Sequence, residues 1–168
     1  MELFDAIILW IHLVAAVLFV GPQVFLAAVA IPSLQTLEDV PARRALSRRI
    51  TRGFGVLGGG ALAVLVLTGF YNYAQASDDG LLDLKRYFWV LNIKLLLVVV
   101  VVILTGLHAM VFGRRLQELQ ESNASEAEIA RVRQQSMIAS VANLAASLAI
   151  LLCAALLTSE WSRMGGLR

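Results

Sequence analysis

Four long apolar stretches occupy most of this chain of 168 residues. They cover residues 3–31, 54–73, 87–112 and 137–159. A helix of roughly 20 apolar residues crosses a hydrocarbon core of about 30 Å, and each stretch reaches that length. Because lipid offers the backbone no hydrogen-bond partners, each stretch must satisfy its own N–H and C=O groups as a helix. The sequence therefore predicts an all-α integral membrane protein, a bundle of four transmembrane helices.

Polar sequence next to the third and fourth stretches extends the expected helices beyond the bilayer. Ser125 and Glu128 form the Ser-x-x-Glu pattern of a capping box, which marks the start of the fourth helix. Pro22 lies inside the first stretch and predicts a kink there. The expectation is a single transmembrane domain, residues 1–168, with helices at approximately 3–31, 54–73, 87–121 and 126–159. A helical hairpin extends helices three and four into the cytoplasm.

Loop charges set the expected orientation, because loops rich in Lys and Arg stay in the cytoplasm. Cationic side chains concentrate in the first and third loops: Arg43, Arg44, Arg48, Arg49, Arg52, Arg114, Arg115, Arg131 and Arg133. Both termini should therefore face outward, in the cytoplasmic (inner) membrane of a prokaryote. The net charge of +2 arises from residues at membrane ends, so membrane lipid and not nucleic acid is the expected partner.

Polar residues inside the apolar stretches recur at helical spacing. His12 and Gln23 share one face of helix one, and Lys94, Thr105 and His108 share one face of helix three. Polar groups that faced lipid would be costly, so these faces should turn toward a common interior. Helix rise then predicts two sites at different depths. The outer site contains His12, Lys94, Asn92, Thr68 and Tyr71, and the inner site contains His108, Asn143 and Gln23.

Intramembrane ionisable residues are rare and usually functional. Imidazole is an axial ligand of haem iron, and a helical bundle with an inward histidine forms a haem cradle. His12 is therefore the expected ligand of haem b. Lys94 has three interpretations: it snorkels to the interface, balances a haem propionate, or acts as a neutral second axial ligand. His108 lies about 20 Å deeper, so it holds a second haem or has a structural or proton-handling role.

Other metal and nucleotide chemistry has little support in the sequence. The single cysteine, Cys153, lies in the last apolar stretch, and the methionines are scattered. No histidine cluster or phosphate-binding loop is present. The glycine-rich segment 53–60 allows close approach of another helix or of a flat ligand, and helix packing is the favoured interpretation.

Several short motifs resemble the CopD-like membrane proteins and the related HemJ-like protoporphyrinogen oxidases. They are Trp10-Ile11-His12, Leu67-Thr68-Gly69, Asn92-Ile93-Lys94-Leu95-Leu96 and, on the same helix, His108. The HemJ resemblance implies that His12 ligates haem and that Lys94 is needed for function. The chain departs from that group over residues 24–31, which contain no Arg or His, and this argues against porphyrinogen oxidation. The CopD resemblance implies copper uptake or resistance.

The leading hypothesis is a b-type haem protein that acts in electron transfer or redox sensing as a homo-oligomer, a dimer or a trimer. The sequence does not specify its redox partner. It also leaves open whether the protein is an enzyme; an enzymatic activity would be that of an oxidoreductase. The alternatives are a HemJ-like protoporphyrinogen oxidase, a CopD-like protein of copper transport or resistance, and a non-catalytic subunit of a larger complex.

Overall fold

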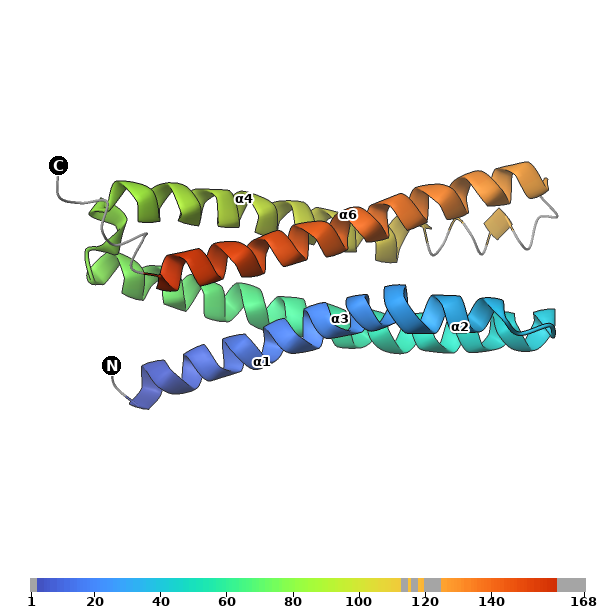
Figure 1. The fold of residues 1–168 in the computed structure, drawn as a ribbon, viewed down its shortest axis with the longest axis horizontal. Helices are drawn as coiled ribbons and strands as arrows, with labels where there is room; N and C mark the ends of the chain where they lie inside the picture. Colours follow the sequence, from blue (N-terminus) through green and yellow to red (C-terminus); the bar gives the residue numbers. More distant parts are fainter. Residues whose placement is uncertain (1–2, 113–114, 116–117, 120–124, 160–168) are drawn as a thin grey trace. The chain divides into compact units, whose positions relative to one another are not determined.

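The computed structural model describes residues 3–112, 115, 118–119 and 125–159 (Figure 1). Every regular element in these ranges is helical. Four helical segments are long and apolar enough to span a membrane: Leu3–Gln35, Val40–Asp78, Lys85–Leu107 and Glu126–Thr158. The prediction of an all-α membrane protein with four spans is confirmed. Contacts group the chain into two compact units, Met1–Asp79 and Gly80–Arg168. The single-domain expectation stays a prediction, and each unit is described by itself.

The first span combines three helical pieces. Helix α1 (Leu3–Phe25) passes into a π-helical segment, η1 (Leu26–Ala30), and then into α2 (Ile31–Gln35). Pro22 lies inside α1, one turn before the π-helical hydrogen bonds of η1 begin at Leu26. Because proline lacks a backbone N–H, it interrupts the regular hydrogen-bond ladder, and a short π segment is another local irregularity that bends an α-helix. The helical span thus continues beyond the expected end at residue 31.

The second span differs most from expectation. Helix α3 (Val40–Asp78) has 39 residues and begins far before the expected residue 54. Its N-cap is Asp39, whose side chain accepts a hydrogen bond of 3.1 Å from the N–H of Ala42, and Pro41 lies in the first turn. The arginine-rich segment predicted as a loop is therefore helical. Hydropathy detects only the part of a helix that lies in lipid. The arginine-rich part of α3 was missed because Arg is polar, although it is a good helix former in water.

In the first unit, α1 packs antiparallel against α3 (Figure 1). Buried side chains on α1 include Ala15 and Phe19, and those on α3 include Ala61 and Thr68. Phe19 lies 4.0 Å from the position that a Cβ at Gly58 would take. A Cβ at Gly53, Gly55, Gly59 or Gly60 would meet nothing within 4 Å, so in this glycine-rich segment only a side chain at position 58 would touch a neighbouring helix.

The second unit is also an antiparallel helix pair (Figure 1). Gly80, with φ of 70°, leads through the 3₁₀ turn η2 (Leu81–Asp83) into α4 (Lys85–Leu107). A π-helical segment, η3 (His108–Phe112), follows α4. The expected continuation to residue 121 lies largely outside the described residues. Helix α6 (Glu126–Thr158) packs against α4, where Val101 and Ser147 are only 1% and 2% exposed.

The predicted N-cap of α6, Ser125, is confirmed, whereas the return bond of a full capping box, from the Ser125 N–H to the Glu128 carboxylate, is not among the hydrogen bonds of the described residues. Ser125 is the N-cap, and its Oγ accepts a hydrogen bond from the N–H of Glu128 at 3.4 Å. The same hydroxyl donates to Glu128 Oε2 at 3.1 Å. Local sequence alone therefore locates the beginning of this helix.

Candidate functional site

His12 of α1 faces α3 and contacts Thr68, a polar side chain within the apolar stretch of that helix. The imidazole Nδ1 lies 2.7 Å from Thr68 Oγ1. Thr68 is 9% exposed and His12 is half-buried. The next residue on α3 is Gly69, where a Cβ would lie 3.7 Å from His12 Cε1. A methyl group at Gly69 would make an ordinary van der Waals contact with the imidazole, so the ring lies directly beside α3.

The contacts of Thr68 determine the tautomer of His12. Thr68 Oγ1 lies 2.7 Å from the carbonyl oxygen of Val64, and its single proton is donated there. If Thr68 donated that proton to the imidazole instead, Thr68 Oγ1 and the Val64 carbonyl oxygen would lie 2.7 Å apart with no hydrogen between them. Both contacts are hydrogen bonds only when His12 Nδ1 carries a proton and donates it to Thr68. The ring lone pair then lies on Nε2, the atom that would coordinate a metal.

A second polar cluster joins α1 and α3 two helical turns before His12. Tyr71 Oη donates to Asp5 Oδ1 at 2.6 Å, and Gln75 Nε2 donates to Tyr71 Oη at 2.9 Å. Gln75 Nε2 also lies 3.3 Å from Asp5 Oδ1. Sequence reasoning included Tyr71 but missed Asp5 and Gln75. The spacing of seven residues from Asp5 to His12 would have placed both on one helix face.

Gln23, predicted for the inner site, hydrogen-bonds within its own helix. Its Nε2 donates to the carbonyl oxygen of Phe19 at 3.1 Å. The Phe19 carbonyl lies one turn earlier on α1, so this donor is directed along the helix.

In the second unit, Lys94 of α4 is half-buried and lies near Cys153 of α6. Among the described residues, its ammonium forms no hydrogen bond or ion pair. Asn92, predicted for the same site, is exposed, and its Nδ2 donates to the carbonyl oxygen of Phe88 at 2.8 Å. Lys94 therefore lies against α6, whereas the Asn92 amide bonds to its own helix.

The predicted inner residues of this unit lie near the end of α4. His108 is half-buried and is the first residue of the π segment η3. Thr105, three residues earlier, donates from Oγ1 to Asn143 Oδ1 of α6 at 3.5 Å. Ser147 Oγ donates to the Asn143 carbonyl at 2.7 Å. Asn143 thus belongs to a polar contact between α4 and α6 through Thr105, and its predicted grouping with His108 and Gln23 stays a prediction.

The structure therefore joins His12 to Thr68 in the first unit and Thr105 to Asn143 in the second. The predicted pairings of His12 with Lys94, and of Gln23 with His108, combine residues of different units and stay predictions. Within the described ranges, no group of three or more His, Cys, Asp or Glu side chains is arranged to hold a metal ion.

Comparison with known proteins gives one family. A family model described as "Copper resistance protein D" matches residues 48–157. The match includes Thr68, Lys94, His108 and Cys153, and it begins after His12. No curated protein and no solved structure matches the chain.

Proposed function

Because this chain belongs to the copper resistance protein D family, we propose that it handles copper in the membrane, with copper as the cargo that it binds or moves. The observation that carries this proposal is the family match, which covers most of α3 and all of α4. We place the chain in a prokaryotic cytoplasmic membrane with both termini outside, because its arginines gather on the opposite side.

We assign His12 Nε2 as a copper ligand. Imidazole suits copper, and a ligating histidine usually donates its other N–H to an oxygen acceptor. The Nδ1–Thr68 hydrogen bond of 2.7 Å supplies that second contact. Cu(I) accepts low coordination numbers, so a site with few ligands is compatible with the described side chains.

Copper handling is tested in cells and with purified protein. Cells that express the chain should differ from empty-vector cells in copper content and in growth under added copper. The purified protein should compete with a chromogenic chelator for Cu(I), and His12→Ala should weaken that affinity by tenfold or more. Ser140→Ala is the control, because the Ser140 hydroxyl is exposed and donates to the Ser136 carbonyl of its own helix, outside every proposed site.

The outcomes distinguish a failure of the copper proposal from a failure of the assignment of His12 as the ligand. Wild-type protein without copper affinity and without any effect on cellular copper would refute copper handling. A His12→Ala variant that binds Cu(I) as tightly as the wild type would refute only the assignment of His12 as a ligand.

The same geometry favours haem b as a second candidate. A histidine that ligates haem iron binds through one ring nitrogen while the other is held by a hydrogen bond, and His12 has that arrangement with Thr68. Bound haem would supply one-electron redox chemistry, and His12 would hold it. A Soret band in the purified protein that is lost in His12→Ala would support haem binding. A colourless protein after expression with added haem precursor would rule it out.

A further inference from the structure

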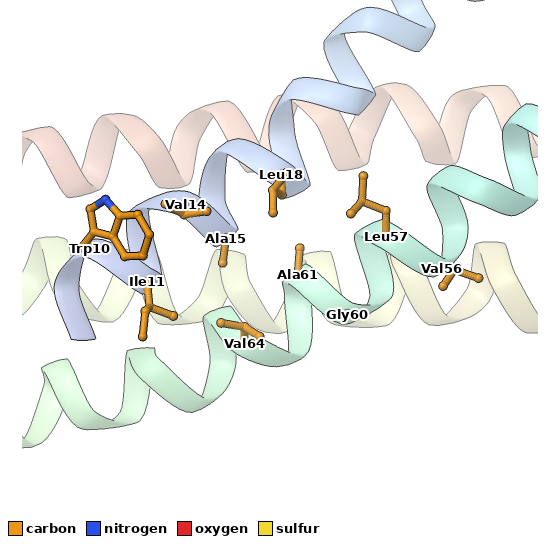
Figure 2. Close-up of a pocket in the computed structure, with 10 residues that line it drawn as sticks. All are labelled: Trp10, Ile11, Val14, Ala15, Leu18, Val56, Leu57, Gly60, Ala61 and Val64. Carbon is orange, nitrogen blue, oxygen red and sulfur yellow. The ribbon is translucent and has the colours of Figure 1, made fainter. Parts of the chain in front are cut away.

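An apolar groove runs along α1 and α3 in the first unit. It has a volume of about 500 Å³, and Figure 2 shows its lining side chains coming from these two helices. Trp10 and Leu18 of α1 are 64% and 41% exposed, and Val56 of α3 is 74% exposed. A Cβ at Gly60, which also lines the groove, would meet no atom within 4 Å. Sites of this volume accommodate small organic ligands.

Cationic side chains lie on α3 just before this groove. Arg49 and Arg52 are exposed, and neither forms an ion pair with any residue that the structure describes. The sequence of α3 contains no acidic residue before Asp78, so no carboxylate of this helix neutralises them. Arg49 and Arg52 therefore present positive charge without a carboxylate partner among the described residues, where α3 leaves its apolar stretch.

Helical register places these charges in line with the groove. Arg52, Val56 and Gly60 follow one another at intervals of four residues, and Arg49 precedes Val56 by seven. Arg52 lies about 6 Å, and Arg49 about 10 Å, along the axis from Val56. The headgroup layer adds roughly 5–7 Å to each side of the hydrocarbon core, so both guanidinium groups reach the level of lipid phosphates.

We propose that this surface binds one anionic glycerophospholipid, with its phosphate on Arg49 and Arg52 and an acyl chain in the groove. Guanidinium groups form charge-assisted hydrogen bonds with phosphate, which accounts for the headgroup. The apolar walls beside Gly60 accommodate the chain. Anionic lipid, and not a zwitterionic one, is the occupant because the two charged side chains in line with the groove, Arg49 and Arg52, are both positive. This site is independent of the copper and haem proposals.

The test is native mass spectrometry of the full chain in detergent with added lipid. Dioleoyl phosphatidylglycerol is compared with dioleoyl phosphatidylcholine, which has the same acyl chains. The double variant Arg49→Gln/Arg52→Gln should weaken phosphatidylglycerol binding by roughly 30-fold, since each basic side chain near an anionic headgroup contributes a factor of about five. The control is Arg43→Gln/Arg44→Gln, which removes the same charge about two turns farther from the apolar stretch. This variant should change the affinity for phosphatidylglycerol less than threefold.

A second pair of variants tests the groove. Gly60→Leu should fill it and weaken binding of both lipids, whereas Gly59→Leu adds the same side chain at a position that does not line the groove. Circular dichroism confirms that each variant is folded. Equal affinity for the two lipids, or unchanged phosphatidylglycerol binding in the Arg49/Arg52 variant, would overturn the proposal. Unchanged lipid binding together with altered oligomeric mass in Gly60→Leu would identify an interface between copies and overturn it as well.

Discussion

Thr68 determines the chemistry available to His12. Its Oγ1 donates to the Val64 carbonyl and accepts from His12 Nδ1, each at 2.7 Å. A Thr hydroxyl bonded to its own helix is common, and by itself it only satisfies a polar group inside the membrane. Here the hydroxyl also orients an imidazole and leaves its lone pair on Nε2. Under the copper proposal, Thr68 would therefore act through His12, as a positioning residue.

Replacing Thr68 by Val removes this acceptor with little change of shape. We expect Thr68→Val to weaken Cu(I) binding by 10- to 100-fold, the usual effect of losing a second contact behind a metal-bound histidine. Thr68→Ser keeps the hydroxyl and should stay within threefold of wild type. Chelator competition measures both. Equal affinities in Val and Ser variants would show that the hydroxyl does not orient the ligand.

At the scale of single elements, small side chains decide how closely two helices approach. Ser147 and Val101 are almost completely buried where α4 and α6 meet. Transmembrane helices associate mainly by close packing of small residues, because lipid is as apolar as the helix surface. Ser147 also satisfies its own hydroxyl on the Asn143 carbonyl at 2.7 Å, so it needs no partner from α4.

Enlarging Ser147 should therefore separate the two helices. We expect Ser147→Leu to destabilise the protein by about 1–3 kcal/mol, the usual cost of overpacking a filled site. Ser147→Ala, which keeps the size, should cost less than about 1 kcal/mol because the bond to its own helix is lost without any change in packing. Thermal unfolding in detergent measures both. A Leu variant as stable as the Ala variant would contradict this account of the α4–α6 contact.

Helix caps give a second prediction at this scale. Asp39 accepts a hydrogen bond from Ala42 N at 3.1 Å and begins a helix in a segment that hydropathy had assigned to a loop. We expect Asp39→Ala to destabilise the start of α3 by about 1 kcal/mol, and Asp39→Asn to be nearly neutral. Amide hydrogen exchange over residues 40–50 reports this directly. Identical exchange in Ala and Asn variants would mean that the cap is unimportant.

For the whole molecule, the principal property is that four helices of the described residues are long and apolar enough to cross a membrane. Asp39 and the exposed arginines of α3 belong at one membrane surface, and the turn near Gly80 belongs at the other. Loop charge assigns the arginine side to the cytoplasm. The family match agrees with a multi-pass membrane protein and leaves this orientation as a prediction.

Cysteine labelling tests the orientation. In a Cys153→Ser background, Asp79→Cys should react with an impermeant maleimide on intact cells. Leu37→Cys, in the turn between α2 and α3, should react only after the membrane is opened. The reverse pattern would show that both termini are cytoplasmic.

The sequence alone determined the four spans and the start of α6, and it placed His12 and Thr68 in one predicted site. These features depend on local causes: apolar length, the hydrogen-bonding demand of lipid, and the cap at Ser125. The sequence missed the extent of α3 because hydropathy does not detect a helix that continues into water.

Only the tertiary structure decided which atoms meet across α1 and α3. Helical periodicity tells which face a residue occupies, but not which residue of another helix it contacts or in what rotamer. The His12 tautomer, the Asp5–Tyr71–Gln75 contacts and the groove beside Gly60 depend on that rotation and register. Close packing between helices fixes both, and close packing is a property of the folded pair.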